Sequence, residues 1–208
     1  MSGAILYCTV TTPSIYIVYD NFTSMDWYDD MRSRMRRGNE ILFPKDSPLL
    51  RPLDAVIRTT DRRILVLWAL DLAEDSVRYM ESVMPNEKRP RDALNAARDW
   101  AFGKVRMGFA RRRILDCHAL SKELRDPCLI AECHAVGQAC SVVHTVGHSL
   151  GYPIYDLTAQ VHRHGPEDCK DAVESRAGMY LERLTYWREN ADDGGDTWAK
   201  FIESSGKL

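Results

Sequence analysis

The chain has 208 residues, 45% of them hydrophobic, and a formal net charge of −2. This length suits one domain with appendages or at most two small domains, and the near-balanced charge gives no strong attraction to nucleic acid or acidic membranes. No apolar run reaches the roughly 18 residues that a transmembrane helix needs, and the apolar N-terminus lacks the basic start of a signal peptide. We therefore expect a cytoplasmic protein that has neither nucleic acid nor a membrane as its partner.

Residues 1–57 are predicted to form an N-terminal arm and a proline-rich loop. The β-branched and aromatic stretches Ile5–Val10 and Ser14–Tyr19 are separated by a Thr-Thr-Pro segment, which is typical of a short hairpin or an extended arm. Asp26–Arg37 is predicted to be a short helix, and three prolines then interrupt the chain. An arm of this kind is also a route to a homodimer.

Residues 58–190 carry a strong helical period and are predicted to form a helical bundle domain. The expected helices run from Asp61 to Pro85, from Arg89 to Gly103, over Lys104–Leu124 with Met107 on the apolar face, over Pro127–Leu150, near Ile154–Val161, and over Glu167–Arg188. Connections of about three to eight residues imply antiparallel neighbours. The predicted fold is all-α, an antiparallel or orthogonal bundle of about five to six helices with a short β-like or irregular N-terminal arm. Residues 191–208 read as a linker and C-terminal tail.

Small residues and histidines crowd into Ile130–Tyr155, which contains no Lys or Arg and only one carboxylate. On a continuous helix, one narrow stripe would hold Cys133, Gly137, Cys140, His144, Gly147 and Gly151. Such a stripe lets a neighbouring backbone come close. The six cysteines include no C-x-x-C pair, so we expect reduced, mostly buried thiols.

The histidines in this stretch raise the question of a metal site. His144 and His148 are four residues apart, as are Cys140 and His144, and His118 on the preceding helix is a further ligand candidate. No acidic groups that would orient ligating imidazoles accompany them. We therefore favour polar anchors that are hydrogen-bonded inside the bundle, and we expect no cofactor, although a bound transition metal stays an alternative.

Opposite charges lie on the first two helices of the bundle. Asp71 and Glu74 belong to the first, and Arg89, Arg91 and Arg98 belong to the second. They favour salt bridges across a helical hairpin, with a recognition surface as the alternative. Two further candidates for a polar anchor or a recognition role are Trp100 and Gln138.

The sequence contains none of the common catalytic signatures. It lacks a P-loop, a G-x-G-x-x-G turn, a G-x-S-x-G elbow, an H-E-x-x-H helix and a Glu-x-x-His pair. An all-α domain without these patterns is less often an enzyme than a binding module.

Four segments in order resemble the immunity proteins of bacterial toxin systems, in the helical family named after the fifth immunity group. The segments are DRRILVLWALDLAE, RPRDALNAARDWAFGK, RRRILDCHAL and AVGQACSVVHTVGHSLGYPIY. The resemblance covers about residues 58–190 and implies a non-enzymatic protein that binds and neutralises a cognate protein toxin. It implies no catalytic residues. The alternative is a helical protein that binds a metal or a small molecule through His144 and His148.

Overall fold

The computed structural model describes residues 25–191 and 197–203, and every regular element within these ranges is a helix. The elements are α1 (Met25–Arg36), the 3-10 helix η1 (Pro48–Leu50), α2 (Arg51–Ile57), α3 (Arg62–Val83), α4 (Arg89–Ala101), α5 (Met107–Leu120), α6 (Pro127–Ser141), the 3-10 helix η2 (Val146–His148), α7 (Gly151–His164), α8 (Lys170–Asn190) and α9 (Lys200–Glu203). The all-α prediction is confirmed for this part of the chain. The predicted strands at 5–10 and 14–19 lie outside the described residues.

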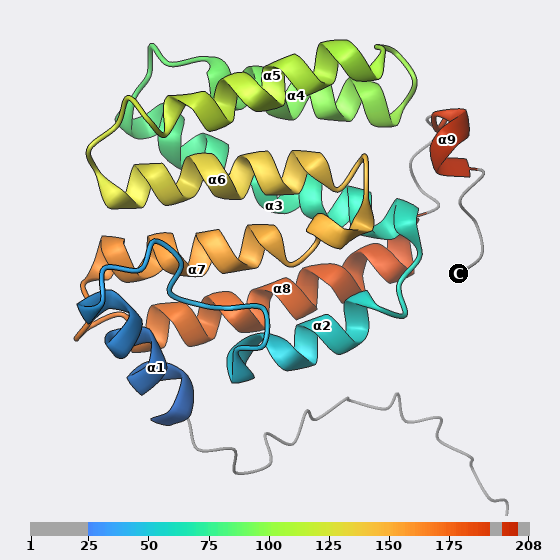
Figure 1. Cartoon of the computed structure of the whole chain (residues 1–208). Helices are drawn as coiled ribbons and strands as arrows, with labels where there is room; N and C mark the ends of the chain where they lie inside the picture. The colour runs from blue at the N-terminus through green and yellow to red at the C-terminus, as the bar shows by residue number, and fades with distance from the viewer. Residues whose placement is uncertain (1–24, 192–196, 204–208) are drawn as a thin grey trace, which may run out of the picture.

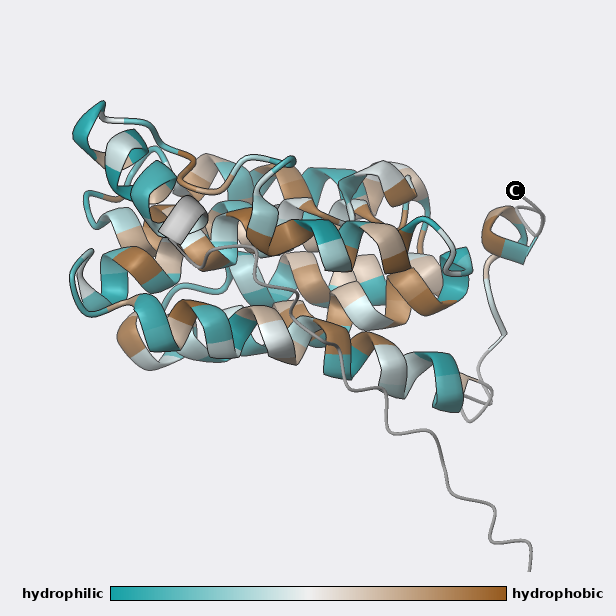
Figure 2. Ribbon diagram, turned by 90° about the horizontal axis from the view of Figure 1, so that it is seen from below, coloured by the Kyte–Doolittle hydropathy of each residue, from teal (hydrophilic) through white to brown (hydrophobic). Residues whose placement is uncertain are grey.

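The long helices α3 to α8 lie side by side, and consecutive helices run in opposite directions (Figure 1). Helix α6 occupies a central position and contacts α3, α4, α5 and α7, while α8 closes the bundle against α3 and α7. In Figure 2, hydrophobic and hydrophilic residues alternate along individual helices, as expected for amphipathic helices. Burial of the apolar stripes therefore supplies the main attraction between the helices.

Local sequence signals set most helix boundaries. The Asp61 side chain accepts a hydrogen bond from the backbone N–H of Arg63 at 2.8 Å and caps α3. Asp126 caps α6 in the same way through Cys128 and Leu129. Gly165 ends α7 with a φ of 84°, a left-handed conformation that favours glycine.

The helix predicted over Pro127–Leu150 is wrong in its second half, because α6 ends at Ser141. The chain then turns, and the backbone N–H groups of His144 and Thr145 both donate to the Ser141 carbonyl at 3.0 and 3.1 Å. Arg62, at the start of α3, donates to the carbonyls of Val143 and His144 at 2.8 and 3.0 Å. These two carbonyls accept hydrogen bonds from the Arg62 guanidinium, whereas in a longer α6 they would accept them from backbone N–H groups. The β-branched residues in the turn also lower helix propensity, so α6 ends here.

The small-residue stripe is therefore divided: Cys133, Gly137 and Cys140 lie on α6, His144 and Gly147 lie in the connecting turn, and Gly151 begins α7. Gly137 of α6 lies directly against the imidazole of His118 from α5, where a β-carbon would overlap with the ring. Gly151, the first residue of α7, lies equally close to the side chain of Gln138. The prediction that small residues permit close packing is confirmed at these two positions, although the packing partners are side chains.

The part of the N-terminal region that the structure describes packs on the same core as the bundle. Met31 of α1 and Leu42 and Phe43 of the following loop are buried. The backbone N–H of Leu42 donates to the Thr158 hydroxyl of α7 at 3.2 Å. The division of the chain at residue 57 remains a prediction.

The C-terminal segment contacts the turn between α4 and α5. The backbone N–H of Ala199 donates to the Ala101 carbonyl at 2.9 Å, and the rings of Trp198 and Phe102 have centroids 5.0 Å apart. None of the helices in the described ranges combines the length and apolarity needed to cross a bilayer.

Candidate functional site

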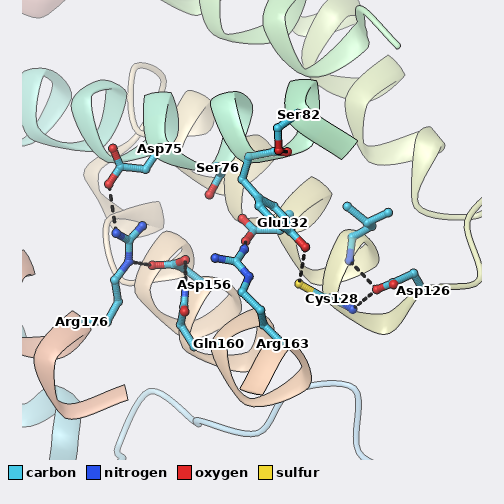
Figure 3. Close-up of polar contacts among 12 residues, drawn as sticks. Asp75, Ser76, Ser82, Asp126, Cys128, Glu132, Asp156, Gln160, Arg163 and Arg176 are labelled. Atoms are coloured by element: carbon cyan, nitrogen blue, oxygen red, sulfur yellow. Dashed lines mark hydrogen bonds and ion pairs between the residues drawn. The ribbon is translucent and has the colours of Figure 1, made fainter. Parts of the chain in front are cut away.

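Two carboxylates are buried at the centre of the bundle, where α3, α6, α7 and α8 meet (Figure 3). Glu132 of α6 and Asp156 of α7 are each 1% exposed. Burial of an isolated carboxylate is strongly unfavourable unless cations and hydrogen-bond donors compensate it. The cations and hydrogen-bond donors around Glu132 and Asp156 therefore determine the charge state of each carboxylate.

Asp156 is compensated by groups from α7 and α8. Its Oδ2 accepts from Arg176 Nε at 2.6 Å and from the Tyr180 hydroxyl at 2.5 Å. Arg176 also donates to Asp75 of α3 at 3.0 Å and to the Tyr152 hydroxyl at 3.0 Å. Burial alone would lower the pKa of the Arg176 guanidinium, but the charge and hydrogen bond of Asp156, together with Tyr152 and Tyr180, outweigh burial and raise the pKa. This guanidinium stays charged and connects three helices.

Glu132 is compensated less completely. It forms an ion pair with Arg163 of α7, whose guanidinium carbon lies 3.6 Å from the ring centroid of Tyr79 on α3. The second carboxylate oxygen, Oε2, has no hydrogen-bond partner among the described residues. Burial, and then the nearby Asp156 charge, raise the pKa of Glu132 to about 7. Burial therefore favours the protonated form of Glu132 more than it would for an exposed carboxyl group.

The charges predicted on the first two bundle helices pair across the α3–α4 hairpin. Arg91 donates to both carboxylate oxygens of Glu74 at 2.8 Å and also bonds Glu81 at 2.8 and 2.9 Å. Arg98 lies 3.7 Å from Glu74. Burial raises the pKa of Glu74, but the hydrogen bonds and charge of Arg91 lower it by more, with a smaller contribution from Arg78. In the structure, Glu74, Arg91 and Arg98 form ion pairs between α3 and α4. A recognition role for these residues remains a prediction.

The other two charged candidates, Arg89 and Asp71, point to different neighbours. Arg89 forms a two-bond pair with Glu123, just beyond α5, at 2.7 Å. Asp71 accepts from the Trp187 indole of α8 at 3.2 Å and lies 3.7 Å from Arg183. The five charged candidates therefore do not converge on one site, because α3 presents Glu74 to α4 and Asp71 to α8.

The predicted histidine ligands are also distributed over several contacts. His144 is exposed and stacks on Trp100, a buried ring of α4, with centroids 6.1 Å apart. His148 Nδ1 lies 2.8 Å from Gln138 Oε1. His144 and His148 are not on one helical turn, because α6 ends before them. A hydrogen-bonded contact thus links His148 to Gln138, whereas the expectation that His144 is a polar anchor inside the bundle is wrong, because His144 is exposed.

His118 has a neighbour that the sequence analysis did not select. Its Nδ1 lies 3.3 Å from Nδ1 of His134 on α6. Burial, and then the charges of His134 and His148, lower the pKa of His118. Cys140 is buried at the α6 interface, and burial raises its pKa to about 12. Across residues 25–191 and 197–203, no group of three or more His, Cys, Asp or Glu side chains is arranged to hold a metal ion.

A cleft of about 1160 Å³ lies between α2, the start of α3 and the turn that joins α6 to α7. Both signs of charge line it, since Lys45 and Arg58 face the same space as Asp61. Ser149, 1% exposed, lies at its base, and its hydroxyl has no hydrogen-bond partner among the described residues. The mixed charge does not define one ligand class.

The buried carboxylate sites were missed by the sequence reasoning. Glu132 is the single carboxylate of Ile130–Tyr155, and a lone charge in a stretch of small residues is the signal that identifies it. Arg163 and Arg176 carry no comparable signal, because most arginines on helices are exposed. His134 was overlooked because its partner lies on another helix.

The described residues form a helical bundle with an apolar core that contains two buried carboxylates paired with arginines. A comparison with protein families matches residues 55–183 to the family described as Imm-5 like putative immunity protein. The match covers 129 of 208 residues, more than half of the chain, so the protein belongs to this family. A search of curated proteins and a search of solved structures each give no match.

Proposed function

We propose that this chain is a non-enzymatic immunity protein that binds a cognate protein toxin and neutralises it by covering its active surface. The main support for the proposal is the family match over residues 55–183, which include α3 to α7 and most of α8. The toxin would be met in the cytoplasm, where an immunity protein has to protect the cell that produces it.

The buried network supports a binding role because it holds the helices in fixed relative positions. Arg176 ties α8 to α7 and α3, and Arg163 ties α7 to α6. A surface that is already ordered loses less conformational entropy on association, so more of its contact energy appears as affinity. Such a scaffold suits an inhibitor that binds without rearranging.

The test is co-expression with the toxin encoded beside this gene. We expect the chain to restore growth of cells that express the toxin, and to form a complex that co-elutes in size-exclusion chromatography. An unrelated toxin in the same assay is the control for non-specific protection. No rescue and no complex with any neighbouring toxin would refute the proposal.

We also propose that the chain works without a resident metal. His148 is engaged with Gln138, and the Cys140 thiol is held protonated by burial. Elemental analysis of the purified protein tests this. Near-stoichiometric zinc, iron, nickel or copper, together with a lower melting temperature after chelation, would contradict the proposal and favour the metal-binding alternative.

A further inference from the structure

Helix α5 lies at the edge of the bundle and exposes most of its circumference. Only Ala110, Ile114, Cys117 and Leu120 are buried, and they form one narrow stripe. The opposite side is exposed along the helix and consists of Met107, Gly108, Arg111, Arg112, Leu115 and Ala119, here called the outer face of α5. Met107 was predicted to be buried and is 51% exposed, which corrects that prediction.

The outer face carries Arg111 and Arg112 and follows a basic segment, in a protein that is acidic overall. Five cations and no carboxylate lie between Lys104 and Arg113. The whole chain carries −2, so the remaining residues sum to −2 − 5 = −7. Arg113 pairs with Asp116 at 3.5 Å, but within the described residues no carboxylate pairs with Arg106, Arg111 or Arg112. Three arginines without a paired carboxylate among the described residues therefore lie close together in the sequence at this edge of the bundle.

Exposed apolar side chains lie next to the arginines on the outer face of α5. Met107 and Leu115 are each 51% exposed, and Arg111 lies between them at helical spacing. Met and Arg are enriched in protein interfaces, whereas interfaces with nucleic acid are much more polar. Two small residues, Gly108 and Ala119, leave room for close approach, and a β-carbon at Gly108 would meet nothing within 4 Å.

The local sequence of α5 is unfavourable for an isolated surface helix. Arg106 occupies the N-cap and gives no side-chain cap, and the first turn contains no acidic residue. Ser, Thr, Asp or Asn would stabilise this end, and a cation near a helix N-terminus opposes the helix dipole. Gly108 in the first turn lowers helix propensity further. An acidic group from a partner would correct each electrostatic defect at once.

We propose that the outer face of α5 is the surface that docks the partner protein, and that it fits an acidic patch that also carries an apolar side chain. This inference rests on the proposed function. Carboxylates of the partner would pair with Arg106, Arg111 and Arg112, and its apolar side chain would cover Met107 and Leu115. The negative charge of the rest of the chain would repel the acidic partner elsewhere, which orients the encounter.

The test uses the cognate toxin and the double variant Arg111→Glu/Arg112→Glu. We expect the dissociation constant to rise by at least about 30-fold, the loss expected for a central interface residue. The matched control is Arg36→Glu/Arg37→Glu, which makes the same charge change at two adjacent exposed arginines at the end of α1. It should leave the affinity within about threefold, since α1 lies on the opposite side of the bundle from α5 (Figure 1). Circular dichroism checks that both variants stay folded.

The outcomes separate this proposal from the function on which it rests. If the wild type binds no toxin, the proposed function fails. If the wild type binds and both double variants bind equally well, the function stands and the docking surface is wrong. If the wild type instead binds duplex nucleic acid or self-associates, and Arg111→Glu/Arg112→Glu abolishes only that, the face has a different occupant and the proposal is overturned. Leu115→Ser provides a second variant that changes no charge and should also weaken toxin binding.

Discussion

The close packing of Gly137 against His118 yields a prediction that isolates one contact. Gly137 is buried within α6, and a β-carbon at this position would overlap with the His118 ring. Gly178 lies within α8, where a β-carbon would meet nothing within 4 Å. Replacing either residue by alanine gains about 1 kcal/mol of helix propensity. At Gly137 the overlap costs about 1–3 kcal/mol, because the imidazole must move away from His134.

We therefore expect Gly178→Ala to stabilise the protein by about 1 kcal/mol, and Gly137→Ala to be about 1–3 kcal/mol less stable than Gly178→Ala. Urea denaturation followed by circular dichroism measures both, with the midpoint shifting at constant slope. Melting temperatures should differ by roughly 2–4 °C per kcal/mol for a chain of this size. Equal stabilisation by the two variants would refute the packing of His118 over Gly137.

Three further predictions concern the buried groups. Arg176→Met leaves Asp156 without its main cation and should reduce the free energy of unfolding by about 3–5 kcal/mol. Urea denaturation measures this loss. A loss below about 1 kcal/mol would show that the buried ion pairs contribute little to stability. The folded pKa of His118 is lowered, so the unfolded state binds more protons and stability is lost as pH falls below the unfolded value near 6.5. In a plot of the free energy of unfolding against pH, His118→Gln should reduce the slope below pH 6.5. Glu132 acts in the opposite direction, but it is present in both the wild type and the variant, so its effect cancels in the comparison. An unchanged slope would show that His118 does not have a lowered pKa. Burial raises the pKa of both Cys133 and Cys140 to about 12. Iodoacetamide at about pH 8 should therefore label these cysteines only after unfolding, as measured by peptide mapping. Fast labelling of the native protein would show that the two thiols are accessible.

The arrangement of buried charge also explains why the bundle has one packing. Glu132 needs its arginine on α7 and Asp156 needs its arginine on α8, so a shift of register would leave a carboxylate without its arginine. A slipped helix pair would therefore be penalised by an unpaired buried charge rather than by lost apolar contact alone. The ion pair of Glu74 and Arg91 acts in the same way across the α3–α4 hairpin, but its side chains are 20% and 24% exposed, so the penalty is smaller.

Most helix positions within residues 58–190 could be predicted from the sequence, because the signals that determine them are local. The proline-rich loop predicted up to residue 57 is wrong over its last part, which forms η1 and α2 with prolines in their first turns. The caps at Asp61 and Asp126, the proline in the first turn of α4 and the glycine after α7 each act within a few residues. Hydrophobic period then identifies the buried side of most helices. Helix α5 is the exception: its period placed Met107 inside, but its position at the edge of the bundle leaves Met107 exposed.

The sequence by itself determined the helical character of residues 58–190, the order of the main helices and a resemblance that the family match confirms over residues 55–183. Tertiary structure decided where α6 ends, because the guanidinium that takes the carbonyls after Ser141 comes from Arg62, 81 residues before Val143. It also decided which charges are buried together and which histidines face each other, since those pairs join different helices. Contacts between residues distant in the chain leave no trace in local composition or spacing, and the site is made of such contacts.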